Sequence, residues 1–289
     1  MKLVSYQMNE ESAVGVISGE QLIIPLKGIA SDMLSLIRSG EEGLDKVRHY
    51  LANNDEGILL ENVTLLAPIP GPVRNIMCLG KNYAEHAAET YRVWGGQAEP
   101  PAFPMIFNKA TTAINGPFAD IPYDASVSTN IDFEAELAVI IGRTGKNITR
   151  EAAMDHVFGY TVMNDLTARD LQRRHKQFFK GKSLDGHAPM GPWIVTANEL
   201  TNPHNLRVTC HVNNVLKQDD VTANMIFDIP EIISQLSLGM TLLPGDIIAT
   251  GTPSGVGFAR VPPEYLQPGD IVTSTVESIG EIRNVIAAE

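Results

Sequence analysis

The stretch Asp132-Phe133-Glu134-Ala135-Glu136-Leu137-Ala138-Val139-Ile140-Ile141 decides both the fold and the chemistry of this chain. An apolar run that continues unbroken to Ile141 predicts a long central strand over 131–141. Side chains alternate between the two faces of a strand, so Glu134 and Glu136 project from the same face, about 7 Å apart along the chain. The stretch therefore predicts a buried strand that presents two carboxylates side by side.

Two carboxylates on one face of a buried strand repel each other and lose their hydration. A divalent cation removes both penalties, and oxygen ligands suit Mg²⁺ or Mn²⁺. We therefore expect Glu134 and Glu136 to bind one divalent cation per active site. The alternative is an edge strand whose acidic face lies in water.

A third carboxylate, Asp165, follows another apolar, strand-like run. Strand ends that lead into a helix are common positions for functional side chains; the alternative is that Asp165 only caps the helix. We expect that helix over 168–178, with Thr167 as its N-cap. Arg169 and Gln172 then share a helix face, and the arginine suits a bidentate contact with a ligand carboxylate.

Lys182 lies among glycines and prolines in the segment 179–192, which we expect to be a loop. A cation in such a place can stabilise an enolate or a carboxylate beside a metal; the alternative is a solvent-exposed lysine. The triplet Gly181-Lys182-Ser183 is not a phosphate-binding loop, because the earlier glycine of that motif is missing at the needed spacing.

Three glycines follow a strand-like run in Thr250-Gly251-Thr252-Pro253-Ser254-Gly255-Val256-Gly257. Glycines at such positions let backbone N–H groups approach an anion closely. The spacing matches neither a dinucleotide-binding turn nor a Gly-x-Ser-x-Gly nucleophile motif, so the sequence supports neither of those enzyme classes.

The segment from Ala84 to Glu89 favours a short helix on which His86 and Glu89 share a side. A carboxylate that orients an imidazole and raises its basicity makes a general base for activating water. The alternative is an exposed contact on a helix surface. We expect the following loop-like segment, 93–101, to order over the substrate, within a lid region of 85–101.

The rest of the chain predicts an α+β fold dominated by β structure. Short strand-like runs precede Pro25, and the two segments 33–37 and 44–51 have helical spacing. Three prolines and a glycine within 67–72 interrupt this pattern. We therefore expect a small N-terminal subdomain over 1–70 and a catalytic domain over 71–289.

Composition narrows the choice of partners. The chain has 289 residues, with 22 Lys and Arg against 34 Asp and Glu, a formal charge of −12. An acidic chain repels nucleic acid and anionic membrane surfaces. Cys78 and Cys210 stand in apolar contexts and are expected to be buried free thiols, which suit a reducing cytoplasm. No apolar run approaches a membrane span, and no targeting segment is expected.

At these motifs the chain resembles the fumarylacetoacetate hydrolase family. The matching pieces occur in family order and span roughly residues 72–289. They are Gly80-Lys81-Asn82-Tyr83-Ala84-Glu85-His86, Phe133-Glu134-Ala135-Glu136-Leu137, Asn164-Asp165-Leu166-Thr167-Ala168-Arg169-Asp170, Gly181-Lys182-Ser183 and the segment 250–257 quoted above. The resemblance is strongest to bacterial members that act on short α-keto diacids, including oxaloacetate decarboxylases, and to acylpyruvate hydrolases.

The resemblance implies a mixed β-roll catalytic domain, a homodimer and a set of functional residues. Metal ligands would be Glu134, Glu136 and Asp165; catalytic residues would be His86, Glu89 and Lys182; substrate contacts would be Tyr83, Lys109, Arg169, Gln172 and Thr252. The implied substrate is a small α-keto acid, bound as a pyruvate-like head on Mg²⁺ or Mn²⁺.

We predict cleavage of a C–C bond through a metal-bound pyruvate enolate, by acylpyruvate-type hydrolysis or by oxaloacetate decarboxylation. Keto–enol isomerisation of 2-hydroxymuconate-type compounds is an alternative on the same scaffold. Two further alternatives are a Schiff-base lyase acting through Lys182 and a non-catalytic metal-binding scaffold.

Overall fold

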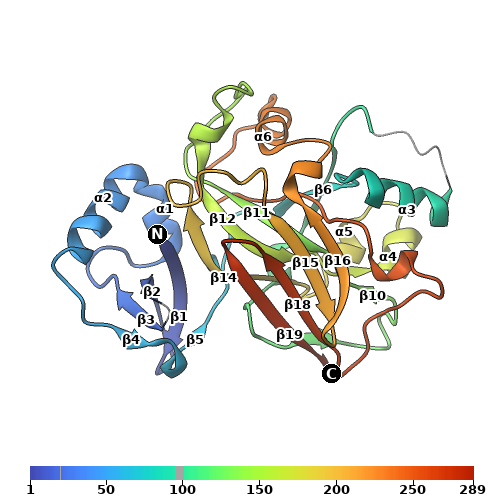
Figure 1. Cartoon of the computed structure of the whole chain (residues 1–289), viewed down its shortest axis with the longest axis horizontal. Coiled ribbons are helices and arrows are strands. Elements are labelled where there is room, and N and C mark those ends of the chain that lie inside the picture. Colours follow the sequence, from blue (N-terminus) through green and yellow to red (C-terminus); the bar gives the residue numbers. More distant parts are fainter. Residues whose placement is uncertain (20, 96–100) are drawn as a thin grey trace.

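A computed structural model describes residues 1–19, 21–95 and 101–289 (Figure 1). Its largest element is a mixed sheet that runs across the molecule. In spatial order the sheet contains β4 (Ile58–Leu59), β3 (Leu22–Pro25), β2 (Glu11–Ser18), β1 (Lys2–Met8), β14 (Ala188–Thr196), β12 (Val157–Asn164), β11 (Ala135–Ile141), β17 (Ile247–Ala249), β6 (Ile76–Gly80) and β7 (Met105–Lys109), with β5 (Thr64–Leu65) on β1 and β8 (Ile114–Asn115) on β14.

A second sheet packs against the centre of the first. Its order is β16 (Val215–Val221), β15 (Arg207–Val212), β18 (Ile271–Val276), β19 (Gly280–Ala288) and β9 (Ile121–Tyr123). Strands β15 and β18 contact β11, and β19 contacts β14. Leu137 and Val139 of β11 share one apolar cluster with Val208 and Val272 of the second sheet, and burial of this cluster stabilises the pair of sheets.

The helices lie at the two ends and the top of the molecule in Figure 1. They are α1 (Met33–Arg38), α2 (Gly40–Leu51), α3 (Ala84–Trp94), α4 (Arg169–Arg174), α5 (Phe179–Lys182) and α6 (Ile229–Ser237), with 3₁₀ turns η1 (Leu60–Asn62), η2 (Thr111–Ala113), η3 (Ala153–His156), η4 (Thr222–Asn224) and η5 (Gly257–Ala259). Helix α6 begins after Asp228, whose side chain caps it, and Pro230 lies in its first turn.

The predicted β-dominated α+β fold is confirmed, with three local corrections. The strand expected over 131–141 is broken into β10 (Ile131–Asp132), which pairs with β13 (Thr167–Ala168), and β11. The helix expected over 168–178 ends at Arg174, because Lys176 has a left-handed φ of 60°, and Ala168 rather than Thr167 is its N-cap. The segment expected to be a loop around Lys182 contains α5.

The expected subdomain over 1–70 shares the large sheet with the rest of the chain. Lys2 and Leu3 of β1 pair with Val195 and Ile194 of β14. Apolar side chains of α1 and α2 lie in the same cluster as Ile140 of β11, so the core crosses the expected boundary. The division into two domains at residue 70 stays a prediction.

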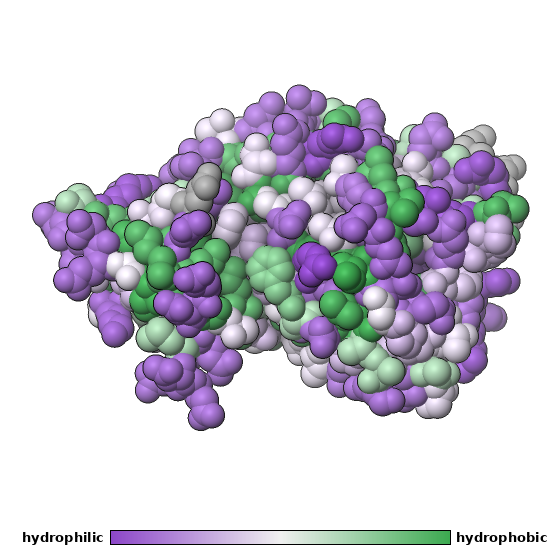
Figure 2. All heavy atoms as spheres, turned by 60° about the horizontal axis from the view of Figure 1, so that its bottom comes forward, coloured by the Kyte–Doolittle hydropathy of each residue, from purple (hydrophilic) through white to green (hydrophobic). Residues whose placement is uncertain are grey.

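The molecular surface carries both hydrophilic and apolar side chains. Hydrophilic side chains cover most of the face shown in Figure 2, with separate apolar patches between them. Cys78 and Cys210 are buried free thiols, as expected. Among the described residues, no helix has both the length and the apolar character that crossing a membrane requires.

Candidate active site

The three predicted metal-ligand carboxylates converge in the interior. One oxygen each of Glu134, Glu136 and Asp165 lies within 4.8 Å of the others, and all three residues are buried. The antiparallel register of β11 and β12 causes this, because Ala135 pairs with Asn164 and so places Asp165 beside the glutamates. The Asp165 N–H donates to the Glu134 carbonyl at 2.8 Å. The predicted edge-strand alternative is wrong, since β11 is central.

Between β10 and β11 the strand is interrupted, and there side chains accept the hydrogen bonds that a neighbouring strand would otherwise accept. The Glu134 N–H donates to Asn164 Oδ1 at 2.9 Å, and the Ala135 N–H donates to Gln218 Oε1 at 3.0 Å. Buried N–H groups are thereby satisfied without a neighbouring strand. Because these bonds replace regular strand pairing, Glu134 lies directly before β11 rather than within it.

Buried cations surround two of the three carboxylates. Lys182 Nζ lies 2.7 Å from Glu134 Oε2 and 2.6 Å from Asp165 Oδ2. Lys109 Nζ forms a 2.7 Å ion pair with Asp165 Oδ1, although its aligned hydrogen bond goes to the Leu166 carbonyl at 2.9 Å. The alternative of a solvent-exposed Lys182 is therefore wrong, because its side chain is 2% exposed.

These ion pairs set the charge states of the site. Burial alone would raise the pKa of Glu134, but Lys182 and then Arg169 outweigh burial and lower that pKa to about 2. Burial would lower the pKa of Lys182, yet Asp165 and Glu134 raise it above the usual value. The two ion pairs favour the ammonium form of Lys182, which lacks the free electron pair that a Schiff-base nucleophile needs.

Glu136 lacks the cationic contact that its neighbours have. It accepts a hydrogen bond from the Gly251 N–H at 2.7 Å, and no Lys or Arg of the described residues forms an ion pair with it. Burial, followed by the charges of Asp165 and Glu134, raises its pKa well above the usual range. A divalent cation within the triad would supply the missing positive charge, so the residues present fit such an ion.

The predicted pair of His86 and Glu89 is formed and buried. His86 Nδ1 lies 2.8 Å from Glu89 Oε1, and the two side chains are 8% and 6% exposed, which rules out the alternative of an exposed contact. The Gly255 N–H donates to both carboxylate oxygens of Glu89 at 3.0–3.1 Å. Because Nδ1 faces Glu89, Nε2 is the imidazole nitrogen left for chemistry.

The backbone N–H groups of the glycines in 250–257 donate hydrogen bonds to anions, as expected. The anions are carboxylates of the protein itself. The Gly251 N–H donates to Glu136, and the Gly255 N–H donates to Glu89. Gly251 has a φ of 100°, and a Cβ there would lie 2.7 Å from the Cβ of Asn82, so only glycine fits without displacement.

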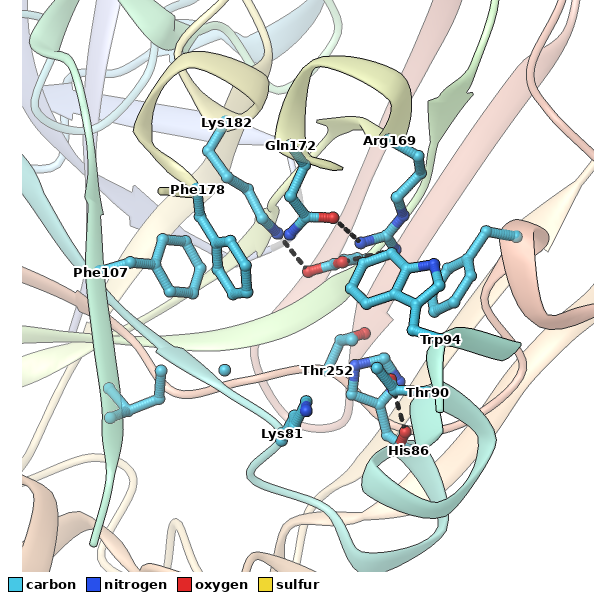
Figure 3. A pocket seen from close by; sticks show the side chains of 14 residues that line it. Lys81, His86, Thr90, Trp94, Phe107, Arg169, Gln172, Phe178, Lys182 and Thr252 are labelled. Atoms are coloured by element: carbon cyan, nitrogen blue, oxygen red, sulfur yellow. Dashed lines mark hydrogen bonds and ion pairs between the residues drawn. The ribbon is translucent and has the colours of Figure 1, made fainter. Parts of the chain in front are cut away.

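A cavity opens beside the triad (Figure 3). Lys182, Gln172 and Arg169 lie on one side of it, and His86, Thr252 and Lys81 lie on the other (Figure 3). Aromatic rings form its walls: Trp94 stacks on Phe258 with centroids 4.8 Å apart, and Phe107 meets Phe178 edge to face at 5.5 Å.

Predicted substrate contacts divide into two groups. Arg169, Gln172 and Thr252 line the cavity, and Arg169 Nη1 donates to Gln172 Oε1 at 3.2 Å. Tyr83 and Lys109 do not line it: the Tyr83 hydroxyl is buried without a hydrogen-bond partner, and Lys109 lies against Asp165. Their positions do not support direct substrate contact. Within the predicted lid, α3 extends to Trp94, whereas 96–100 lie outside the described residues.

Sequence analysis did not select Asp132. Its buried carboxylate accepts from Arg169 Nε at 2.8 Å and from the Gly257 and Phe258 N–H groups at 2.7 and 3.0 Å. Asp132 therefore fixes the guanidinium that contacts Glu134 at 2.6 Å. The signal was present in the sequence, because Asp132, Glu134 and Glu136 are acidic at alternate positions.

Comparison with protein families finds a match to the model described as fumarylacetoacetate (FAA) hydrolase C-terminal, over residues 75–287. Among curated proteins, oxaloacetate tautomerase YisK of Bacillus subtilis is 42% identical over 287 residues, which cover 96% of this chain and 94% of that protein.

Solved structures give the same result for the fold. The fumarylacetoacetate hydrolase of Exiguobacterium antarcticum matches with a TM-score of 0.85 and 39% identity over the full length of both chains. Maleylpyruvate hydrolase from Sphingobium sp. SYK-6, solved with manganese(II) and pyruvate, matches with a TM-score of 0.81 and 30% identity over 100% of this chain and 99% of that one.

Proposed function

Because the chain belongs to the fumarylacetoacetate hydrolase family of enzymes, we propose that it interconverts the keto and enol forms of a small α-keto acid, with oxaloacetate as the favoured substrate. The observation that carries the proposal is the buried triad of Glu134, Glu136 and Asp165 with Lys182 in contact with it. Similarity to an oxaloacetate tautomerase over nearly the whole of both chains supports the choice of substrate.

The triad would hold Mg²⁺ or Mn²⁺, and the manganese bound in the similar maleylpyruvate hydrolase supports this assignment. When bound, the ion supplies Lewis-acid polarisation of the keto group and a fixed place for the adjacent carboxylate. Lys182, which contacts Glu134 and Asp165, adds a second positive charge beside the triad, where it stabilises the oxygen that becomes negative in an enolate.

Proton transfer is the task of His86. With Nδ1 held by Glu89, Nε2 removes a proton from the carbon next to the keto group, and the electrons of the broken C–H bond form the enolate. The same imidazole then returns that proton to the enolate oxygen. Glu89 keeps the ring oriented and stabilises the imidazolium while it carries the proton.

A stopped-flow absorbance experiment tests this proposal. The enol form of oxaloacetate absorbs ultraviolet light more strongly than the keto form, so ketonisation is followed as a loss of absorbance with Mg²⁺, Mn²⁺ or EDTA present. We expect acceleration by the metal-loaded protein and none with EDTA. A folded, Mn²⁺-loaded protein that leaves the uncatalysed rate unchanged would rule the proposal out.

C–C bond cleavage is the second candidate function. The pair of His86 and Glu89 can activate water as well as move a proton, and the similar maleylpyruvate hydrolase supports this candidate. Release of pyruvate from acylpyruvates, or of pyruvate and CO₂ from oxaloacetate, distinguishes cleavage from tautomerisation, because tautomerisation alone leaves every C–C bond intact.

A further inference from the structure

Three cationic side chains from lysine and arginine line the described part of the cavity, and two of them are neutralised by the protein. Arg169 pairs with Asp132 and Glu134, and Lys182 pairs with Glu134 and Asp165. The third, Lys81, forms no ion pair with a carboxylate of the described residues. Within the part of the chain that the structure describes, Lys81 is therefore the cavity-lining cation that no carboxylate neutralises.

The backbone holds Lys81 in a conformation that costs free energy. Its φ is 55°, in the left-handed region that favours glycine. The adjacent Asn82 enforces this turn: its side chain donates to the Thr250 carbonyl at 2.8 Å and accepts from the Phe227 N–H at 2.8 Å. A non-glycine residue fixed in this way at a cavity suggests that its side chain has a use there.

The place of Lys81 defines which part of a substrate it can reach. It follows β6 directly and lies across the cavity from Lys182 and Arg169 (Figure 3). Its ammonium lies 4.0 Å from the centroid of the Tyr91 ring on α3, which positions the charge without cancelling it. The keto-acid head belongs at the triad beside Lys182, so Lys81 faces the opposite end of the bound molecule.

We propose that Lys81 binds the second carboxylate of the substrate and selects α-keto dicarboxylates over α-keto monocarboxylates. This inference rests on the proposed function, because it assumes that the keto-acid head lies at the triad. An ammonium that pairs with a carboxylate in a partly buried cavity favours the dianion, and an uncharged acyl group at the same place gains nothing from it.

Calorimetry on Mn²⁺-loaded protein tests the selection without relying on turnover. The probes are 3,3-difluorooxaloacetate, a dicarboxylate that has no proton at C3, and pyruvate, a monocarboxylate. We expect Lys81→Met to weaken binding of the dicarboxylate about 10- to 100-fold, the usual value of a hydrogen bond to a charged group. Pyruvate binding should change less than about threefold, and Lys81→Arg should recover part of the dicarboxylate affinity.

Two further variants separate this role from structural effects. Lys81→Gly suits the left-handed backbone, so it should melt no lower than wild type and yet lose the same dicarboxylate affinity. Lys2→Met removes a lysine that likewise lies over an aromatic ring, that of Trp193 at 4.8 Å, outside the cavity lining. It should leave both affinities unchanged.

The outcomes show whether the role of Lys81 fails alone or together with the proposed function. Wild-type protein that binds neither keto acid overturns the proposed function and the role of Lys81 together. If wild type binds both keto acids and Lys81→Met changes the two affinities equally, or changes neither, only the role of Lys81 is overturned. Selective loss of the dicarboxylate supports both.

Discussion

Two glutamates separated by one residue have opposite charge environments. Glu134 contacts Lys182 and Arg169, and its pKa is lowered to about 2. Among the described residues Glu136 accepts a hydrogen bond only from the Gly251 N–H, and burial beside two carboxylates raises its pKa well above the usual range. Glu136 is therefore the ligand that gains most from a bound cation.

Replacement of Glu136 by glutamine tests this difference. Without metal, Glu136→Gln should be at least as stable as wild type, because it removes a repelled buried charge. Wild type should gain about 2.7 kcal/mol at Mn²⁺ concentrations 100-fold above the dissociation constant, and the variant should gain little. Thermal melts with and without Mn²⁺ measure both effects, with exposed Glu85→Gln as the control. Full Mn²⁺ stabilisation of Glu136→Gln would contradict the metal assignment.

Lys182 should be needed for rate but not for metal binding. Lys182→Met leaves the three carboxylates in place and removes the charge that stabilises an enolate oxygen, so kcat should fall about 10²- to 10³-fold. The Mn²⁺-dependent rise in melting temperature should persist. A variant with unchanged kcat per folded molecule would show that Lys182 is only structural.

His187 predicts a pH dependence of stability that is independent of the triad. Burial lowers the pKa of its imidazole from the ordinary 6.5 to about 4, while its Nε2 bonds to the Pro122 carbonyl at 2.9 Å. The folded state keeps the ring neutral, so the unfolded state binds more protons between pH 6.5 and 4. Stability from this group is complete above pH 6.5 and decreases as the pH falls toward 4.

Denaturant unfolding at pH 7 and pH 5 measures how much His187 contributes to the free energy of unfolding. Between these pH values His187 should cost wild type about 2 kcal/mol, and His187→Gln should be spared that loss. Equal losses in the two proteins would mean that His187 is not held neutral.

At the scale of elements, the proton-transfer pair and the metal ligands come from different parts of the fold. Helix α3 carries His86 and Glu89, whereas Glu136 lies in β11, Glu134 directly precedes β11 and Asp165 directly follows β12. The segment 250–257 joins them, since Gly251 bonds to Glu136 and Gly255 bonds to Glu89. Because the two sets of side chains come from different elements, a substitution can remove the proton-transfer pair and leave the metal ligands in place.

His86→Ala should show this separation. It removes the general base, so tautomerisation and acylpyruvate hydrolysis should fall about 10²- to 10⁴-fold. Decarboxylation of oxaloacetate needs no water and should fall much less, and Mn²⁺ binding should be unchanged. All activities are measured on one preparation with saturating metal; equal large losses in hydrolysis and decarboxylation would contradict this division of roles.

The sequence predicted those parts of the site that depend on local pattern. The strand around Glu136, the helix of His86 and the position of Asp165 follow from periodicity and strand ends. It did not predict the break before Ala135, which depends on hydrogen bonds to the distant Gln218. Nor did it predict the burial of Lys109, because contact with Asp165 arises only after the strands have paired.

At the scale of the whole molecule, the buried acidic site lies in a chain with a net charge of −12. A positive charge inside the cavity, from Lys81, then opposes the overall repulsion of an anionic substrate. The predicted homodimer and cytoplasmic location stay predictions. Light scattering of the purified protein tests the first, with a mass of about twice 31.4 kDa as the expected result.

The pairing of β1 with β14 limits how this protein can be divided or recombined. The matched family region begins at residue 75, which invites expression of the remainder as an autonomous module. Such a fragment would expose the β14 edge and the apolar side chains that now face Leu3 and Leu36. We expect residues 71–289 alone to aggregate, and co-expression of residues 1–70 as a separate chain to restore solubility. Because β1 and β14 must fit each other, we expect a chimaera with a relative to fold only when residues 1–70 and the β14 region come from the same protein.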